Sequence, residues 1–519
     1  MKTAALLALC LLGPSPVWAD ARPSGELTVA LSSFATEVLD PVLGGHGVKF
    51  YLALIFDYLI GVTPDGQLSP DLGIATAWEP SADHKRWTFT LRRGVRFHNG
   101  DELTSSDVKW SLLRAISKRS TTGYAGVLRA LLQDIETPAP DRVVIVTKEP
   151  TLVIPPYLSR ALSSEGMILP RKYVEAVGDD MFAQKPIGSG PYRFVEQVTG
   201  SHVKLEAVER HWRLGTPKYR IVTFRVVPEE ATRMAMVRRG DVDVADVSRD
   251  RVREMERAGF PIYYRNNDAL LHLWWILPWD RVPVRDKRVR EALNLAIDRR
   301  EIAATIFGGK AEPAGVPFGL TWGFRDVRWR NAETDQYPFD PARARKLLAE
   351  AGYPRGFPIS IFAYQLPALP EGKEMAEAVS GYWQKIGVQP KLIPVDYPAF
   401  RKQWVDRAAP GAVGYYNLPN RDWIGTYTLL EKFAHTPSKP TDTVADPEID
   451  GMLEAILRET DREKINVFMR RIFARLRSEH YGVPLVYLHT PYVTSKRIAH
   501  WNPGSVMLDL NIDELAAQR

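Results

Sequence analysis

The chain has 519 residues, more than one hydrophobic core usually organises, so two or more lobes are expected. Hydrophobic residues make up 45% and charged residues 25% of the sequence, which excludes a disordered, fibrous or low-complexity protein. The formal net charge is only +6, and basic residues are interleaved with acidic ones, as in residues 285–288 (RDKR), so no nucleic-acid partner is expected.

The first 21 residues have the pattern of an export signal. Lys2 precedes an apolar run over residues 4–12, and a cleavage site of the small-x-small type follows at Val17-Trp18-Ala19. The apolar run is shorter than the roughly 20 residues that a membrane-spanning helix needs. The only cysteine, Cys10, lies inside this run, so the mature chain would contain neither disulfides nor thiol-ligated metals. We therefore expect residues 1–21 to be a cleaved signal peptide and the mature protein to be periplasmic.

Strands dominate the sequence between residues 26 and 227. Apolar residues alternate with polar ones over residues 87–91, which predicts a half-buried strand. Thr104 and Asp107 form a capping box that begins a helix, whose buried face we predict to contain Val108, Leu112, Leu113 and Ile116. Further strands are predicted over residues 142–147, 192–197, 202–208 and 221–227.

Helices with clear start and stop signals dominate the second half of the chain. Residues 289–297 form an apolar stripe, and Asp298, Asp340 and Asp446 each precede a helical pattern that they are expected to cap. Short strands are predicted between these helices, over residues 359–363 and 391–394. This alternation of helix and strand predicts an α/β lobe.

No stretch of the sequence has the arrangement of residues that enzyme catalysis needs. Gly188-Ser189-Gly190 lacks the first glycine of a nucleophile elbow, because Pro186 stands there, and we interpret it as a turn before a strand. The ten histidines form no metal-binding pair, and His98 is interpreted as a turn or packing residue. Asp241 and Asp243 are interpreted as surface carboxylates at a strand edge rather than as a glycosidase pair. We therefore expect no enzyme activity, no metal and no cofactor.

Aromatic residues are the most informative feature that remains, with 14 tryptophans and 20 tyrosines. Such side chains combine a large contact area with a polar tip and suit ligand clefts, although most tryptophans in any protein lie in the core. For the two clusters, a ligand pocket and a core are equal alternatives. The clusters are Trp274, Trp275 and Trp279, and Tyr415, Tyr416, Trp423 and Tyr427.

Five segments occur in the same order as recurring segments of a known family. The longest covers residues 94–111, GVRFHNGDELTSSDVKWS. The others are PIGSGPY at residues 186–192, RGDVD at 239–243, RVREALNLAID at 288–298 and AEAGY at 349–353. Together they resemble family 5 of the extracellular solute-binding proteins, which includes the dipeptide-, oligopeptide- and nickel-binding proteins of ABC importers. The resemblance covers nearly all of the mature chain.

The resemblance implies a bilobal periplasmic-binding-protein fold, with two α/β lobes joined by a hinge and an extra subdomain in the first lobe. Lobe I would comprise residues 22–267 and 487–519, with the subdomain at about 50–185, and lobe II residues 268–486. The function implied is that of a monomeric substrate-binding protein, whose lobes close over a small-molecule ligand such as a peptide, an opine or an organic acid. It would deliver that solute to the ABC transporter permease subunits in the inner membrane.

The resemblance also implies where the ligand would bind. In peptide-binding members an aspartate of the second lobe pairs with the amino terminus of the ligand, and Asp422 is the only acid in the corresponding stretch. Arg421 could instead pair bidentately with a carboxylate or phosphate, or both residues could be exposed loop residues. The candidate ligand-binding residues are Ser33, Phe34, Trp274, Trp275, Tyr415, Asn417, Arg421, Asp422 and Trp423.

Two other functions stay open at this point. An exported hydrolase acting on a small polar substrate would fit the alternating α/β elements and the 62 carboxylates, and loss of turnover on mutation of one carboxylate would favour it. A periplasmic sensor partner or chaperone could share the same fold, and capture of a receptor rather than a permease would favour that function.

Overall fold

The computed structural model describes most of the chain after the predicted signal peptide. The described residues are 22–34, 37–44, 49–64, 66–162, 164–276, 283–316, 337–364, 371–395, 400, 403, 411–417, 426–427, 430–431, 434–436, 444–504 and 509–516. At residues 266–269, 274–276 and 411–417 the description covers the backbone. The predicted signal peptide, residues 1–21, lies outside the described residues.

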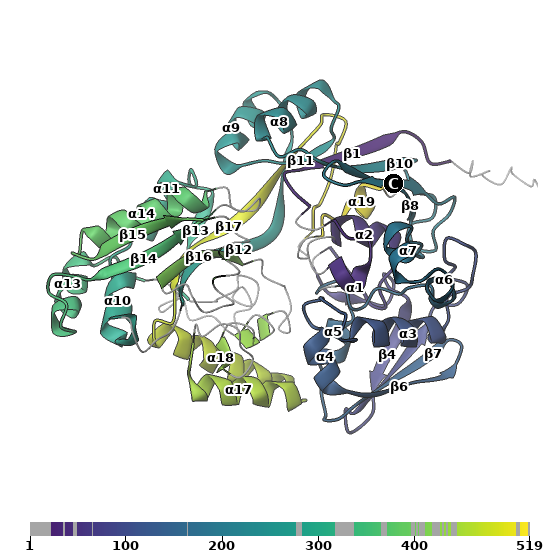
Figure 1. The fold of residues 1–519 in the computed structure, drawn as a ribbon, viewed down its shortest axis with the longest axis horizontal. Helices are drawn as coiled ribbons and strands as arrows, with labels where there is room; N and C mark the ends of the chain where they lie inside the picture. The colour runs from purple at the N-terminus through teal and green to yellow at the C-terminus, as the bar shows by residue number, and fades with distance from the viewer. Residues whose placement is uncertain are drawn as a thin grey trace, which may run out of the picture.

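Two long strands connect the lobes, β12 (Ile262–Ile276) and β17 (Val483–Thr494) (Figure 1). They pair antiparallel, from Ile262 opposite Val493 to Leu273 opposite Val483, and the register shifts between Arg265 and Ala269. Such an irregularity bends a strand and increases its twist. The predicted lobe boundaries, 267/268 and 486/487, fall inside these two strands, and the first falls inside the irregularity. We call the elements before β12, together with α19 (Ile512–Ala516), the first lobe, and those between β12 and β17 the second lobe.

The two connecting strands lie in the middle of one large sheet, which continues into both lobes. In its described part the strand order is β15-β14-β16-β12-β17-β11-β1-β10-β9-β8. The strands on the second-lobe side are β15 (Gln389–Pro394), β14 (Pro358–Ala363) and β16 (Gly411–Asn417). Those on the first-lobe side are β11 (Val244–Asp246), β1 (Glu26–Leu31), β10 (Ile221–Val226), β9 (His202–Ala207) and β8 (Tyr192–Val198).

The first lobe packs helices against its part of the sheet. The helix α2 (Lys49–Ile55) is buried at every residue and packs with β1 and β10 in one hydrophobic core. On β1, β11 and β17 a separate core is formed by α8 (Glu230–Arg239) and α9 (Arg249–Arg257). The helices α1 (Pro41–Gly44), α6 (Arg171–Val177) and α7 (Asp179–Gln184) complete the main part of this lobe.

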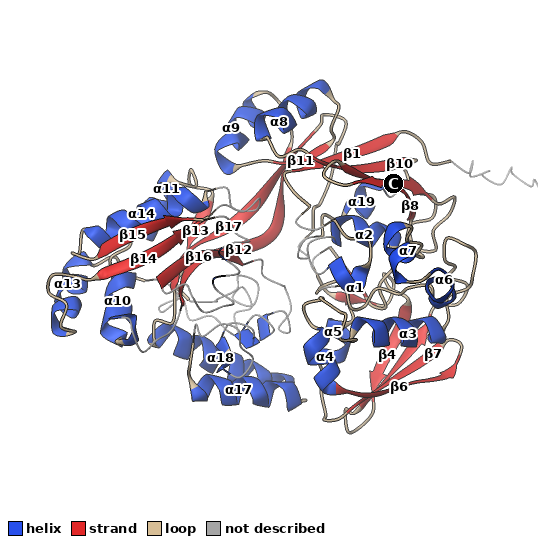
Figure 2. Cartoon of the chain, viewed as in Figure 1, coloured by secondary structure: helices blue, strands red, loops and turns tan. Residues whose placement is uncertain are grey.

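A smaller antiparallel sheet forms a subdomain of the first lobe. Its strands are β4 (Ala75–Pro80), β5 (Arg86–Leu91), β7 (Arg142–Thr147) and β6 (Leu132–Ala139), in that order. Figure 2 shows α3 (Ser105–Ala115) lying over this sheet, with α4 (Ala125–Leu131) and α5 (Ile154–Tyr157) at one end. The alternation predicted for residues 87–91 is confirmed, because Trp87, Phe89 and Leu91 are buried.

The start of α3 is confirmed, and one residue of its predicted buried face is corrected. The carboxylate of Asp107 accepts hydrogen bonds from the amide nitrogen of Thr104 at 3.0 Å and from its hydroxyl at 2.9 Å. Leu113 is 47% exposed, whereas Val108 and Leu112 are buried. Successive helical residues point about 100° apart, so Leu113 turns outward from the face that Leu112 buries.

Helices cover the sheet of the second lobe. They are α10 (Lys287–Leu295), α11 (Arg299–Thr305), α13 (Pro341–Glu350) and α14 (Gly372–Gln384), while α17 (Pro447–Arg458) packs on α18 (Arg462–Ser478). The predicted caps are confirmed: the carboxylates of Asp298, Asp340 and Asp446 each accept hydrogen bonds from backbone amides of the following helix. The short strand β13 (Ala311–Pro313) pairs with β17.

The prediction that Asp241 and Asp243 are both surface carboxylates is wrong for Asp243. Asp241 pairs with Arg239 at the surface, but Asp243 is fully buried. Its carboxylate accepts hydrogen bonds from the Thr28 amide and the Ser495 hydroxyl, each at 2.9 Å, and from Arg497. The carboxylate thus links β1 to the chain just after β17, contacts that join residues more than 200 positions apart.

Candidate functional site

The parallel strands of both lobes point to the place where a ligand would bind. In open α/β sheets, ligands bind beyond the carboxyl ends of the parallel strands. In the second lobe β14 runs parallel to β15 and β16, and these strands end at Ala363, Pro394 and Asn417. In the first lobe β1 runs parallel to β10 and β11, and it ends at Leu31, two residues before the predicted Ser33. Candidate residues from both lobes therefore lie at or just after the expected edges.

The chain after β1 is held in place by a partly buried carboxylate. Asp246, the last residue of β11, accepts hydrogen bonds from the amide of Ser32 at 3.1 Å and from its hydroxyl at 2.7 Å. Burial raises the pKa of Asp246, although Arg233, 3.0 Å away, and Ser32 both act to lower it. These contacts fix the backbone directly before Ser33, which is itself exposed. Ser33 is thus placed at the carboxyl edge of the first lobe.

Phe34 does not occupy the position expected of a ligand contact. Its side chain is only 2% exposed, and its ring lies 5.3 Å from that of Phe50 and 5.8 Å from that of Tyr51. Both partners belong to α2, so the chain after β1 turns back onto this helix and buries the ring between them. The structure corrects the prediction for Phe34: it belongs to the hydrophobic core of the first lobe.

Four of the candidate residues lie on two neighbouring strands. Trp274 and Trp275 of β12 are paired with Val413 and Ala412 of β16. On the same strand pair, Tyr415 is opposite His272, and Asn417, the last residue of β16, is opposite Leu270. The sequence showed two separate aromatic clusters, and the register of this pairing brings together the backbones of Trp274 and Trp275 from one and of Tyr415 and Tyr416 from the other. Arg421, Asp422 and Trp423 lie outside the described residues; in the sequence they follow the carboxyl end of β16 by four to six positions.

Aromatic residues of both lobes also share one hydrophobic cluster, which contains Tyr157 of α5 and Tyr427. Tyr157 is fully buried, and its ring lies 5.3 Å from that of Tyr124. Burial raises the pKa of Tyr157 well above its ordinary value, and the hydroxyls of Tyr427 and Tyr124 add to this effect. Tyr427 is 1% exposed, so of the two alternatives for its cluster the core holds for this residue.

Sequence reasoning missed a buried ion pair between the lobes. The Nη1 atom of Arg249, in α9, lies 3.0 Å from each carboxylate oxygen of Glu371, directly before α14. The two residues are 122 positions apart and neither stands in a recognisable motif, so no local pattern could have indicated the contact.

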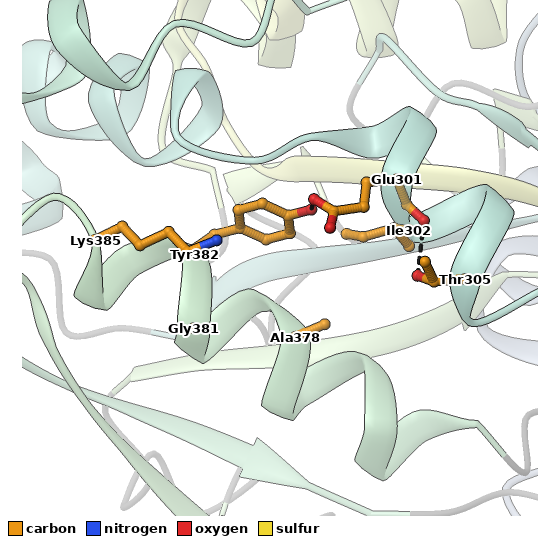
Figure 3. A pocket seen from close by; sticks show the side chains of 7 residues that line it. All are labelled: Glu301, Ile302, Thr305, Ala378, Gly381, Tyr382 and Lys385. Atoms are coloured by element: carbon orange, nitrogen blue, oxygen red, sulfur yellow. Dashed lines mark hydrogen bonds between the residues drawn. The ribbon is translucent and has the colours of Figure 1, made fainter.

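A small pocket on the second lobe does not have the size of a ligand site. It has a volume of about 190 Å³ and lies between α11 and α14, lined by Glu301, Ile302, Thr305, Ala378, Gly381, Tyr382 and Lys385 (Figure 3). The Tyr382 hydroxyl points at the Glu301 carboxylate, to which it donates a hydrogen bond. Pockets for small molecules usually measure about 300–1,000 Å³.

The described residues give no sign of a membrane span or of a metal centre. No described helix combines the length and the apolar character needed to cross a membrane. Among the same residues, no three histidine, cysteine, aspartate or glutamate side chains converge as metal ligands would.

Comparison with known proteins places this geometry in context. Residues 69–441 match the family model described as bacterial extracellular solute-binding proteins, family 5 Middle. The heme-binding protein A of Haemophilus influenzae is 28% identical over 436 residues, which cover 77% of this chain and 75% of that protein. The dipeptide-binding protein of Escherichia coli is 27% identical over 393 residues, covering 69% and 68% of the two chains.

A solved structure supports the same fold. The ABC transporter-associated periplasmic binding protein DppA from Helicobacter pylori, in complex with the peptide STSA, superposes with a TM-score of 0.78. It is 19% identical, and the superposition covers 96% of this chain and 98% of that one. At this identity the likeness concerns the fold alone, and it confirms the predicted bilobal α/β architecture of periplasmic binding proteins.

Proposed function

Because the chain belongs to family 5 of the bacterial extracellular solute-binding proteins, we propose that it is the periplasmic substrate-binding protein of an ABC importer. It captures a peptide-like or other small polar or amphiphilic solute between its lobes. It then delivers the solute, chemically unchanged, to the permease subunits in the inner membrane. The observation that carries this proposal is the family match over residues 69–441, on a chain whose two lobes are joined by β12 and β17.

The ligand class is argued from the relatives and from the candidate residues. The relatives named above bind heme and dipeptides, and the solved structure holds a tetrapeptide. These solutes combine apolar surface with charged groups. Trp274, Trp275, Tyr415 and Trp423 would supply apolar contact. Asp422 would pair with the amino terminus of a peptide ligand, or Arg421 would instead pair with a carboxylate or phosphate. Ser33 and Asn417, at strand ends of the two lobes, would add hydrogen bonds.

The remaining features of the proposal concern the localisation of the protein, its lobe boundaries and the closure of its lobes. Residues 1–21 act as the signal peptide, and the mature protein works in the periplasm as a monomer, without a cofactor and without enzyme activity. Lobe I comprises residues 22–267 and 487–519, with its subdomain at about 50–185, and lobe II comprises residues 268–486. Closure is a hinge motion of these two bodies, and the irregularity between Arg265 and Ala269 in β12 is where the bend would concentrate.

The test is to identify the solute that copurifies with gently isolated mature protein, by native mass spectrometry. The released solute is then titrated back, alongside dipeptides, tetrapeptides, opines, organic acids and heme, with tryptophan fluorescence and small-angle scattering as readouts. We expect stoichiometric binding, a smaller radius of gyration, and a solute recovered unchanged. The absence of any fluorescence or scattering change across all these classes would contradict the proposal. Recovery of a chemically altered solute would favour the exported hydrolase.

A further inference from the structure

The Arg249–Glu371 ion pair links two hydrophobic cores, each of which also contains residues of the connecting strand β17. Arg249 begins α9, whose Val252 and Met255 belong to the core formed with β1 and β11. Glu371 directly precedes α14, whose Met375 and Val379 belong to the core of the second lobe. The ion pair therefore connects a helix of one lobe to a helix of the other.

The Arg249 guanidinium makes contacts on both sides of the connection. Its Nη1 atom donates to both carboxylate oxygens of Glu371 at 3.0 Å. Its Nη2 atom donates to the carbonyl oxygen of His489, in the connecting strand β17, at 2.9 Å. The guanidinium carbon lies 5.8 Å from the ring centre of Phe307, a core residue of the second lobe. A rotation of the lobes about β12 and β17 would have to break or rearrange these contacts together.

Burial makes this pair stronger than a surface ion pair of the same length. Arg249 is 7% exposed and Glu371 is 9% exposed. Two buried charges attract each other with little screening by water, and deleting one of them while the other stays buried leaves that charge without compensation. By contrast, the neighbouring pair of Arg251 and Glu254 lies within α9, with both side chains 42% exposed, and spans no boundary between lobes.

We propose that Arg249 and Glu371 are positioning residues that form an interlobe clasp: their ion pair favours the arrangement of the lobes seen here and thereby sets how readily the protein closes on its solute. The biological role of this clasp rests on the proposed solute-binding function. Its physical content, a shift in the balance between open and closed lobes, does not depend on the ligand. A pair formed in only one arrangement of the lobes adds its free energy to that arrangement alone.

The clasp can be tested by measuring the separation of the lobes in the ligand-free mature protein. Because Cys10 is the only cysteine and lies in the predicted signal peptide, two introduced cysteines would be the only labelling sites. Gly126 in α4 and Gly451 in α17 are suitable, because a Cβ atom at either position meets nothing within 4 Å. The two helices lie in different lobes (Figure 1). Spin labels at G126C and G451C report the interlobe distance by electron–electron double resonance.

We expect R249M and E371Q to move the distance distribution away from the separation that this structure has, with at least a tenfold fall in the population of this arrangement relative to the others. The charge-exchanged variant R249E/E371R should restore much of the original distribution. R251M, which removes the exposed pair in the same helix, is the matched control and should leave the distribution unchanged.

The outcomes separate the clasp from a purely structural role. Unchanged distributions in folded E371Q and R249M would overturn the inference, because the pair would then move with the hinge as one body. If R249M does not fold, the nearly isosteric E371Q decides the matter alone. The measurement uses ligand-free protein, so an unchanged distance distribution would refute the clasp without refuting the proposed function. Conversely, if no solute is found, the distance distributions still test the clasp.

Discussion

The Nε2 atom of His98 lies 2.9 Å from the carbonyl oxygen of Gly190, and this contact secures the turn before β8. The Nδ1 atom of the same ring accepts a hydrogen bond from the amide of Gly188 at 3.2 Å. Only the neutral imidazole can donate at one nitrogen and accept at the other. Burial lowers the pKa of His98 to about 4, in agreement with a ring held in its neutral form.

Acidification is therefore expected to destabilise the protein through His98. The unfolded chain takes up this proton near pH 6.5 and the folded protein only near pH 4, so the contribution is present above pH 6.5 and is lost as the pH falls. Between pH 7 and pH 5 we expect a loss of about 1–2 kcal/mol. H98Q should remove this part of the pH dependence, and urea unfolding of both proteins at pH 7, 6 and 5 measures it. Parallel pH profiles of the two proteins would contradict this assignment.

The glycines of the same turn are required because it lies directly against α2. A Cβ atom at Gly188 would lie 2.0 Å from the carbonyl oxygen of Ile55. Since a backbone atom cannot turn aside as a side chain can, G188A should cost about 3 kcal/mol or more of unfolding free energy. G126A is the matched control, because that position in α4 is open and alanine favours helix by up to about 1 kcal/mol. Equal stability of the two variants in thermal and urea unfolding would refute the steric argument.

The local pattern of the sequence placed the elements that it predicted closely, but it did not predict the first-lobe helices α1, α2, α4, α5, α6 and α7. The predicted strands agree with the observed ones to within two residues at either end, and Asp298, Asp340 and Asp446 cap their helices as expected. These features depend on residues close together in the chain, through side-chain alternation and hydrogen bonds to nearby amides. The turn at residues 188–190 was recognised for the same reason, although its role in packing against α2 was not.

Contacts between distant parts of the chain could not be predicted in the same way. Phe34 follows a strand end, where a ligand residue is expected, but its burial depends on how α2 folds back onto it. Asp243 was predicted to be a surface residue because its contacts with Ser495 and Arg497, about 250 positions later in the chain, leave no local pattern. The Arg249–Glu371 pair depends on the arrangement of both lobes. The sequence identified Trp274 and Trp275 as one candidate group and Tyr415 and Asn417 as part of another. It could not show that the two groups lie on neighbouring strands, because that depends on the pairing of β12 with β16.

A second buried ionic network anchors the C-terminal segment to the first lobe. The Arg160 guanidinium donates to Asp509 at 2.5 Å and to Asp513 at 2.7 Å, and Arg213 lies 2.9 Å from Asp513. Burial alone would raise the pKa of Asp513, but Arg160 and Arg213 hold it well below its ordinary range. Both arginines and both acids are almost fully enclosed.

Removing one charge from this network should be costly. D513N leaves two buried guanidinium groups short of a counter-charge, and we expect the free energy of unfolding to fall by about 3–5 kcal/mol. The control is E206Q, which breaks an exposed pair with Arg193 and should cost at most about 1 kcal/mol. Urea unfolding measures both variants, and limited proteolysis should show earlier cleavage near the C-terminus in D513N alone. A loss under 1 kcal/mol in D513N would mean that the network adds little to stability.

The charge preference of the solute is expected to depend on Arg421 and Asp422, which follow the carboxyl end of β16. If Arg421 holds a carboxylate or phosphate through a bidentate contact, R421A should weaken an anionic solute at least tenfold and a cationic one little. If Asp422 instead holds an amino terminus, D422N should weaken dipeptides but not their N-acetylated forms. Isothermal titration with each solute, for both variants, distinguishes these roles. Equal effects on anions and cations would assign neither residue to charge recognition and would leave both as exposed loop residues.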